Sequence, residues 1–343
     1  MDPEISILVL THNQRCLLER CMESILKQII NVPYEIIVSD DGSNDGTMEY
    51  VRQLGRSGRA KGNRNLMELR YFYCNSDGCK STTQRIGCNR LNAYKHARGK
   101  YFVNVDADDF LVGTDLYQKE FEILETHPEC SMVQTRLLIL DEGKNDDEIT
   151  KGYPNSEKLE NGAVFSLEDV LRYELRGQHQ TYMYRRRPHD DMERLLGFGF
   201  DDIIITYYHL QFGSVVFLDL PGYVWVQYPN SDSRSFNVDD FKTRLLPLNL
   251  GILFKESRYM FLGLGINKMW KTITTAPVYP KLSERTQYSY SHSKAFIYRF
   301  FAEKHHGVYS WSRYCLIWMT VRIMKHFKME SKAWLDFLYL LMV

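Results

Sequence analysis

The sequence has no long apolar run, no paired-cysteine motif and no net charge. Its 343 residues carry 43 lysines and arginines against 43 aspartates and glutamates. No stretch of about 18 apolar residues marks a membrane-spanning helix. The seven cysteines are odd in number and form no Cys-x-x-Cys pair, which argues against a disulfide framework. No repeat of solenoid length is present, which excludes a stacked-repeat protein.

Two cysteine pairs, Cys16/Cys21 and Cys74/Cys79, are a weak match to the ligand spacing of structural zinc. The number and spacing of the cysteines fit free thiols in a reducing compartment better. The acidic start Met1-Asp2-Pro3-Glu4 runs straight into a predicted strand, so we expect no signal peptide and a cytoplasmic protein. Hydrophobic residues make up 44% of the chain, enough for a large core and about two domains.

The neutral total charge hides an asymmetry along the chain. Residues 241–343 hold 16 lysines and arginines against 5 aspartates and glutamates, and residues 1–240 hold the remaining 27 against 38. Such a split suggests two functions on one chain, with the basic end facing an anionic partner.

Strands and helices alternate in the first third of the sequence. Apolar-rich segments predict buried strands over 5–10 and 34–39 and further strands over 68–73 and 101–109. Apolar residues at helical spacing predict helices over 15–30, 48–54 and 84–97, and residues 55–65 are expected to form a loop. The alternation predicts an α/β fold with a mostly parallel sheet.

The pattern is less regular beyond residue 110. It predicts helices over 115–127 and 166–175 and strands over 131–140 and 178–185, with a loop or lid over 141–162. Two further strands, 215–220 and 223–228, are expected on either side of Pro221-Gly222, and a helix is expected to begin at Asp201-Asp202. Beyond about residue 240 the sequence reads as helical, basic and aromatic.

Polar clusters follow three of the predicted strands. They are Thr11-His12-Asn13, Asp40-Asp41 and Asp106-Ala107-Asp108-Asp109. Ligands of open α/β sheets bind outside the carboxyl ends of the strands, so the clusters point to one ligand site. Asp106 and Asp108, at i and i+2 of an extended segment, would face the same side and suit a divalent cation on a diphosphate. Taken alone, each acidic cluster also fits an ordinary turn or helix cap.

Four motifs in order resemble the inverting family 2 glycosyltransferases of GT-A fold. They are the THNQ turn before CMESILKQ (Cys21–Gln28), EIIVSDDGSNDGT (Glu35–Thr47), the stretch from Arg90 to Tyr101, and VDADD. The resemblance implies a Rossmann-like nucleotide-binding mixed sheet flanked by helices over residues 1–235. Residues 1–110 would form the nucleotide-sugar half and 111–235 the acceptor half, followed by a basic helical extension over 236–343.

The resemblance also implies roles for individual residues. Nucleotide contacts fall on Thr11, His12, Asn13, Asp40, Asp41, Arg90 and Asp106. Asp106 and Asp108 would hold Mn²⁺ or Mg²⁺. Asp202, paired with Asp201, matches the catalytic base, although on residue chemistry alone both are also simple helix caps. Tyr228 stands where a metal-binding histidine is usual, so it is either the third metal ligand or a diphosphate contact.

The activity implied is transfer of a sugar, with inversion, from a nucleotide-diphosphate donor such as a UDP-sugar. The acceptor would be a hydroxyl of a glycan or lipid-linked molecule in surface polysaccharide synthesis. A catalytically silent sugar-nucleotide or glycan-binding module stays open, because His12 and Tyr228 depart from the family pattern. A nucleotidyltransferase fits less well, since the THNQ turn lacks the Gly-rich phosphate loop.

The C-terminal residues interleave cations with aromatic and aliphatic side chains. The cations are Lys294, Arg299, Lys304, Arg313, Arg322, Lys325, Lys328 and Lys332. This fits either a helical cap packed on the catalytic domain or an amphipathic surface that meets anionic lipid. The second reading predicts peripheral binding at the inner face of the cell membrane. No nucleic-acid-binding motif is present, so no nucleic-acid partner is expected.

Overall fold

The computed structural model describes residues 2–79, 82–142, 149–151, 159–166, 169, 177–187, 205–206, 208–210 and 212–228. The chain divides into two units, Met1–Ser235 and Phe236–Val343, and all the described residues lie in the first. Three predicted segments lie outside the described residues: the helical extension over 236–343, the helix start at Asp201-Asp202, and most of the helix 166–175. Of that last helix, the structure describes only Ser166 and Asp169.

The first half of the sheet is parallel, as the sequence predicts. Its strands run in the order β3 (Leu66–Tyr73), β2 (Tyr34–Asp40), β1 (Ile5–Thr11) and β4 (Tyr101–Asp106). Helices connect them: α1 (Arg15–Leu26), α2 (Thr47–Arg56), α3 (Gly58–Lys61) and α4 (Thr82–His96). The loop expected over 55–65 was wrong in part, because α2 ends and α3 lies within it. Leu54, just before this range, and Ala60 within it are buried, and this burial favours helix despite the glycines nearby.

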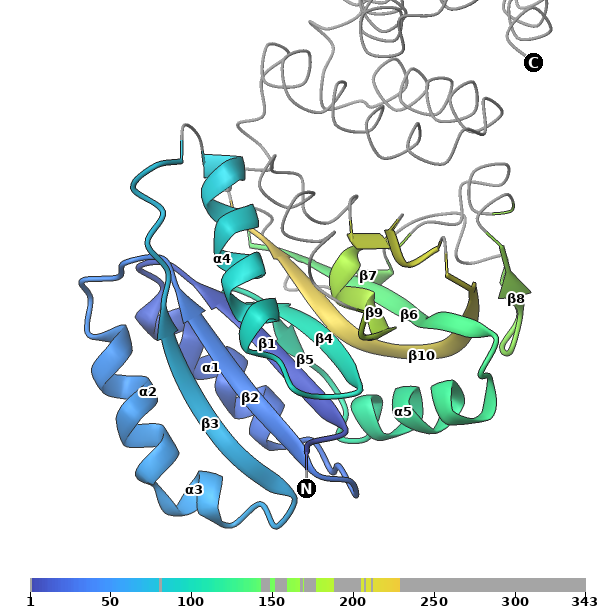
Figure 1. The fold of residues 1–343 in the computed structure, drawn as a ribbon, viewed down its shortest axis with the longest axis horizontal. Helices are drawn as coiled ribbons and strands as arrows, with labels where there is room; N and C mark the ends of the chain where they lie inside the picture. Colours follow the sequence, from blue (N-terminus) through green and yellow to red (C-terminus); the bar gives the residue numbers. More distant parts are fainter. Residues whose placement is uncertain are drawn as a thin grey trace, which may run out of the picture. The chain divides into compact units, whose positions relative to one another are not determined.

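The second half makes the sheet mixed. Strand β9 (Tyr182–Arg185) lies antiparallel between β4 and β6 (Cys130–Asp141), and β10 (Ser214–Gln227) pairs parallel with β6. The remaining elements are β5 (Phe110–Leu111), α5 (Leu116–Thr126), β7 (Ile149–Lys151), β8 (Val164–Phe165) and the 3₁₀ turn η2 (His179–Thr181). The predicted α/β fold with a mixed sheet and flanking helices is therefore confirmed (Figure 1).

One strand replaces the two that were expected around Pro221-Gly222. Strand β10 runs through both residues, and its register against β6 shifts between Phe217 and Pro221 and again between Pro221 and Tyr223. At such interruptions of regular pairing, a residue without a backbone N–H is tolerated. The Pro-Gly pair therefore bends the strand without ending it.

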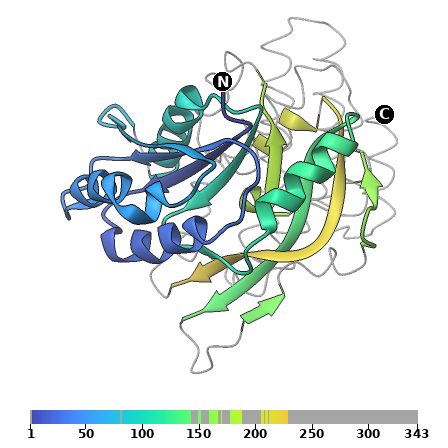
Figure 2. The ribbon, with the colours of Figure 1, turned by 90° about the horizontal axis from the view of Figure 1, so that it is seen from below.

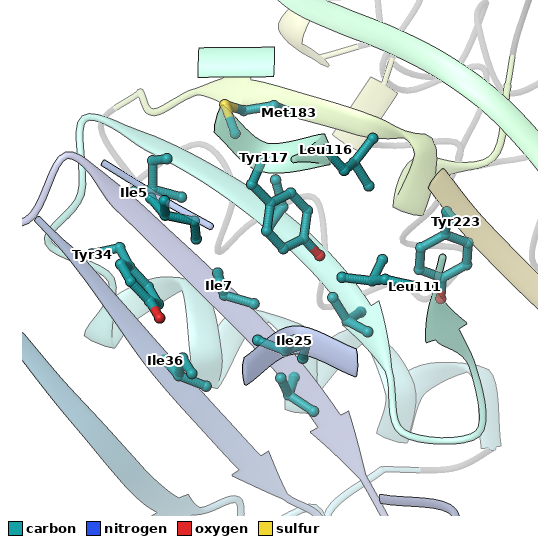
Figure 3. Packing of buried hydrophobic residues seen from close by; sticks show 14 of the residues in the cluster. Ile5, Ile7, Ile25, Tyr34, Ile36, Leu111, Leu116, Tyr117, Met183 and Tyr223 are labelled. Carbon is teal, nitrogen blue, oxygen red and sulfur yellow. The ribbon is translucent and has the colours of Figure 1, made fainter. Parts of the chain in front are cut away.

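The two faces of the parallel half are covered by different helices. Ile5, Ile7 and Val9 of β1 belong to one core cluster with Cys21 and Ile25 of α1, and Figure 3 shows part of this cluster. Successive strand residues point to opposite faces, so Ser6 and Leu8 point toward α4, which packs on β1 and β2. Figures 1 and 2 show α1 and α4 on opposite sides of these strands.

The carboxyl ends of β1, β2 and β4 lie side by side. The ends of the strands are tied together by backbone bonds, Asp41 N–H to the Thr11 carbonyl (3.1 Å) and Ala107 N–H to the Leu10 carbonyl (2.9 Å). The three predicted polar clusters are therefore adjacent in space.

Candidate functional site

A pocket of about 540 Å³ opens at the carboxyl ends of β1, β2 and β4. Six of the predicted site residues line it: Thr11, His12, Asp41, Asp106, Asp108 and Tyr228. Its other lining residues are Leu10, Gln14, Leu17, Thr82, Arg85, Ile86, Asn89, Trp225 and Val226. The hydroxyl of Thr11 is buried and has no hydrogen-bond partner within the described ranges. It is a polar group available to a ligand.

Asn13 is not among the pocket-lining residues, and it joins the turns that follow β1 and β2. It adopts a positive φ of 52°, which asparagine tolerates better than most residues. Its backbone N–H donates to Ser43 Oγ (2.7 Å), and its Oδ1 accepts from the backbone N–H of Asn44 (2.9 Å). The neighbouring His12 is exposed, with Nδ1 lying 2.6 Å from the Asp41 carbonyl oxygen. Asn13 thus shapes the turn from which His12 reaches the pocket.

The two aspartates after β2 occupy different environments. Asp40 is fully buried, and its carboxylate accepts from the Ser43 N–H (3.0 Å), the Ser43 hydroxyl (2.5 Å) and the Tyr71 hydroxyl (2.7 Å). It is not among the residues that line the pocket. Asp41 does line it. Of this pair, the structure therefore presents Asp41 to a ligand and uses Asp40 to build the turn.

Arg85 of α4 is a pocket residue that the sequence reasoning missed. Its Nε donates to Asp41 Oδ2 (2.8 Å) and to Ser76 Oγ (3.2 Å), and its side chain is 40% exposed. The Ser76 hydroxyl donates to the other oxygen of Asp41. Arg85 lies five positions before Arg90, and its spacing from Asn89 places both on one face of the helix. Asn89 was not among the predicted site residues, so the sequence offered no signal for Arg85.

Arg90, by contrast, is buried and reaches the site through Asp106. Its Nη2 lies 2.9 Å from Asp106 Oδ1, and Gln180 of η2 donates from Nε2 to Asp106 Oδ2 (2.7 Å). Burial acts to raise the pKa of Asp106, but Arg90, His179 and Gln180 together hold that pKa below its usual value. Asp106 is therefore an ionised carboxylate with both oxygens already engaged.

Asp108 is the more available carboxylate. Burial and the nearby charge of Asp106 raise the pKa of Asp108 to about 6, while Arg20 and Gln14 act in the opposite direction. Two carboxylates that repel each other in one pocket are a site where a cation is stabilised. The donor set fits Mg²⁺ or Mn²⁺, which commonly take one or two carboxylates together with diphosphate oxygens.

The third aspartate, Asp109, has a structural position. It is almost fully buried, accepts a hydrogen bond from the Tyr223 hydroxyl, and accepts another from the backbone N–H of Val226 (2.8 Å). These bonds hold the end of β10 beside the end of β4. Burial, followed by the charges of Asp108 and Asp106, raises the pKa of Asp109 well above its usual value.

Tyr228 lies at the rim beside Asp108. Its hydroxyl donates to the Asp108 carbonyl oxygen (3.4 Å) and accepts from Arg20 Nη2 (2.9 Å). Arg20 also donates to the Asp108 carbonyl (3.0 Å). No group of three or more His, Cys, Asp or Glu side chains suited to a metal occurs within the described ranges. Asp201 and Asp202 fall outside them.

The fold is shared with a solved structure. The chain resembles S. aureus TarS 1-349 in complex with UDP, with a TM-score of 0.61, 16% sequence identity, and coverage of 96% of this chain and 93% of that one. At this identity the likeness establishes the fold. A family model described as "Glycosyl transferase family 2" matches residues 6–192, more than half of the chain. The chain belongs to this family, and the predicted glycosyltransferase class is confirmed.

Three curated relatives each match less than half of this chain. EpsE of Bacillus subtilis, described as a glycosyltransferase, is 29% identical over 41% of this chain and 45% of its own length. A GalNAc(5)-diNAcBac-PP-undecaprenol beta-1,3-glucosyltransferase of Campylobacter jejuni is 31% identical over 32% of this chain and 31% of its length. A poly(ribitol-phosphate) beta-glucosyltransferase of Bacillus spizizenii is 30% identical over 32% of this chain and 15% of its length. The chain thus spans less than half the length of these relatives.

The last observation concerns segments that could span a membrane. Across the described part of the chain, no helix combines the length and apolar character needed to cross a bilayer.

Proposed function

We propose that the protein is a metal-dependent inverting glycosyltransferase that takes a UDP-sugar as donor. The observation that carries the proposal is the convergence of Thr11, Asp41, Arg85, Asp106 and Asp108 on one pocket. Polar and charged side chains line the pocket together with apolar ones, as a nucleoside diphosphate requires. It lies where open α/β sheets bind nucleotides.

The nucleoside is assigned to the end of the pocket beside Asp41. A carboxylate accepts a hydrogen bond from a base N–H or a ribose hydroxyl, and Arg85 holds Asp41 in place with a charge-assisted bond. His12, at the opposite turn, offers a ring face for the base. The free hydroxyl of Thr11 suits a second polar contact.

The diphosphate is assigned to the end beside Asp108. Asp108, with Asp106 beside it, would hold Mg²⁺ or Mn²⁺. When bound, that ion supplies the positive charge that stabilises the leaving nucleoside diphosphate. Arg90 and Gln180 keep the Asp106 carboxylate fixed and ionised. Tyr228 is assigned to the rim of this end, as a diphosphate contact or a further metal ligand.

The chemical step is a single displacement with Asp202 as the general base and Asp201 beside it in sequence. Asp202 accepts the proton of an acceptor hydroxyl, whose oxygen attacks the anomeric carbon as the nucleoside diphosphate leaves. Attack from the face opposite the leaving group inverts the anomeric configuration.

The names of the relatives support the choice of donor and acceptor. TarS has been solved with UDP and with UDP-GlcNAc, the latter matching at a TM-score of 0.57. The C. jejuni enzyme is named for an undecaprenol-linked acceptor and the B. spizizenii enzyme for a poly(ribitol-phosphate) one. For this chain we propose a glycan or lipid-linked acceptor in the synthesis of a surface polymer.

A thermal-shift titration with UDP, GDP and CDP, each with and without Mn²⁺, tests the donor site. A ligand that binds only the folded state raises stability in proportion to ln(1 + [L]/Kd). We expect metal-dependent stabilisation by UDP in the wild type and its loss in Asp108→Ala. Stabilisation by none of the nucleotides would contradict the proposal.

The Asp202→Asn variant tests the catalytic step. It should lose transfer by at least about a hundredfold, the usual contribution of a general base, and should keep UDP affinity. Equal loss of both would contradict the role of Asp202. Absence of donor hydrolysis by the wild type, with intact UDP binding, would favour the silent binding module.

A further inference from the structure

Two thiols face each other just outside the pocket lining. The Sγ atoms of Cys79 and Cys88 lie 3.1 Å apart, and both side chains are partly exposed. Cys79 belongs to the turn that follows β3, and Cys88 lies on α4. The sulfur atoms of a disulfide are about 2.05 Å apart, so a shift of about 1 Å would bring these two to bonding distance.

We propose that Cys79 and Cys88 form a redox modification site that takes a small-molecule disulfide as its oxidant. The Cys79 thiolate attacks one sulfur of an oxidant such as oxidised glutathione, which gives a mixed disulfide and releases one glutathione thiolate. The Cys88 thiolate then attacks the Cys79 sulfur and releases the second. The two cysteines lose two electrons and two protons, and the glutathione disulfide becomes two thiols.

The order of the two steps follows from the surroundings of the thiols. Burial and the hydrogen bond with Cys79 raise the pKa of Cys88 to about 12. The thiolate is the attacking species, and Cys88 lies within 3.1 Å of the Cys79 sulfur, so it is placed to attack a mixed disulfide formed on Cys79. Cys74 lies nearby but is 5% exposed, and burial raises its pKa to about 11. It is therefore poorly placed to compete for the oxidant.

The cysteine pair is connected to the pocket by a short chain of hydrogen bonds. The backbone N–H of Cys79 donates to the Ser76 carbonyl (2.8 Å), and the Ser76 hydroxyl donates to Asp41. On the other side, Arg85 precedes Cys88 by three residues on α4, so both lie on one face of the helix. Arg85 also contacts both Ser76 and Asp41. Ser76 and Arg85 therefore connect the turn and helix that carry the thiols to Asp41.

Closure of the disulfide should move the turn and leave the helix in place. Helix α4 is anchored by buried Asn89, which donates to the Thr11 and Ser39 carbonyls and accepts from the Ser39 hydroxyl. Moving the turn disturbs the bonds of Ser76 with Asp41 and Arg85. Oxidation should then weaken nucleotide binding, an effect that rests on the proposed function.

The experiment incubates the full-length chain with oxidised glutathione and maps disulfides by mass spectrometry. Trypsin separates residues 71–80 from 86–90, so the disulfide appears as a linked pair of these peptides. Because residues 71–80 hold both Cys74 and Cys79, matched serine variants identify the partner. The linked pair should form in the wild type and in Cys74→Ser and be lost in Cys79→Ser and Cys88→Ser.

Circular dichroism and thermal melting first establish that each reduced variant folds like the wild type. A wild type that yields no linked pair, or a pair that persists in Cys79→Ser, would overturn the modification site.

The same samples report on the pocket. UDP affinity of the oxidised wild type should fall about fivefold, the effect of losing one hydrogen bond. It should recover with dithiothreitol and be unchanged by the oxidant in Cys79→Ser, which lacks the thiol that attacks first. A linked pair with unaltered UDP affinity would overturn the coupling to the pocket. Failure of the reduced wild type to bind UDP would contradict the proposed donor instead, and the peptide map would still decide the modification site.

Discussion

Arg85 brings a positive charge to the pocket while it orients Asp41. Arg85→Ala removes both contributions, so UDP should bind about tenfold more weakly, as expected when a hydrogen bond to a charged group is lost. Isothermal titration with UDP checks this prediction. Arg56→Ala on α2, an exposed arginine outside the pocket lining, is the control and should bind UDP like the wild type. An unchanged affinity in Arg85→Ala would remove Arg85 from the site.

Glu35 is the buried anchor of an ion network on the α4 side of the sheet. Its side chain is fully buried, accepts from Ser6 and from the Arg98 backbone, and pairs with the guanidinium groups of Arg98 and Arg70. Burial acts to raise its pKa, but the bonds from Arg98 and Ser6 and the charge of Arg70 hold that pKa below 4.5. A carboxylate of this kind stabilises the fold in its ionised form.

Glu35→Gln should lower the free energy of unfolding by about 1–3 kcal/mol at neutral pH, because it leaves two arginines without their buried partner. Because folding lowers the pKa of the Glu35 carboxyl group, that group takes up its proton at a higher pH in the unfolded chain than in the folded one. The difference from wild type should therefore be complete at pH 7 and decline as the pH falls below 4.5. Urea unfolding across this pH range measures it.

Glu68→Gln is the matched control for Glu35. Glu68 also pairs with Arg98 and Arg70, but its side chain is 49% exposed, and exposed ion pairs contribute about 0–1 kcal/mol. Its variant should unfold close to wild type at every pH. A pH-independent loss in Glu35→Gln would mean that packing, and not charge, explains its effect.

The sequence could locate the pocket but could not choose among neighbouring residues. Motif order placed the ends of three strands together, and six predicted residues do line one pocket. Asp40 and Asp41 are adjacent in sequence, and only the Ser43 and Tyr71 contacts of Asp40 separate their positions. Arg85 was missed for a similar reason. Its role depends on how α4 is rotated against the sheet, which residue types alone do not fix.

At the scale of elements, the junction between α4 and β4 depends on a close approach of backbones. A Cβ atom on Gly99 would lie 2.6 Å from the Ser6 backbone nitrogen and 2.7 Å from the Tyr101 carbonyl oxygen. The obstructing atoms belong to two strands of the sheet and cannot rotate away. Gly99→Ala should therefore lower the free energy of unfolding by about 1–3 kcal/mol, the usual cost of overpacking.

Gly58 offers the control for this substitution. A Cβ there meets nothing within 4 Å, and the residue begins α3. Alanine is favoured over glycine in helices, so Gly58→Ala should be neutral or slightly stabilising. Thermal melting of the two variants beside the wild type decides the matter. A Gly99→Ala variant as stable as Gly58→Ala would show that the junction relaxes freely.

Strand boundaries were predictable where both faces are buried and less so elsewhere. β1, β2 and β4 are rich in apolar residues, and their positions agree with the sequence reading to within a few residues. β10 was divided in two because Pro221-Gly222 is a typical turn signal. Its pairing with β6 continues past a bulge there, and this non-local pairing overrides the local preference of two residues.

At the scale of the whole molecule, repeated strand–helix units predict a parallel sheet, and that half was correct. The antiparallel insertion of β9 between β4 and β6 has no counterpart in local pattern, because pairing partners far apart in sequence decide it. The resemblance to a family supplied the mixed sheet in advance. The domain boundary at residue 235 and the role of residues 236–343 stay proposals.

The charge asymmetry of the chain gives the last prediction. Residues 241–343 carry 16 basic against 5 acidic residues, and we propose that they bring the enzyme to an anionic membrane surface. The full-length protein should co-sediment with vesicles containing anionic phosphatidylglycerol at low salt, and should be released as salt rises, since exposed charges are screened within about 10 Å at 0.1 M. Vesicles of neutral phosphatidylcholine should bind less.

Replacing Lys325, Lys328 and Lys332 with glutamine tests which charges matter. Each lysine near an anionic surface contributes about 1 kcal/mol, so the triple variant should bind anionic vesicles more than tenfold more weakly. Neutralising Lys27, Lys95 and Lys119 in the N-terminal unit removes the same charge and should leave binding unaltered. If both triple variants lose affinity equally, net charge alone drives the attraction. If neither loses affinity, the C-terminal region has another role, and a helical cap packed on the catalytic domain is the preferred interpretation.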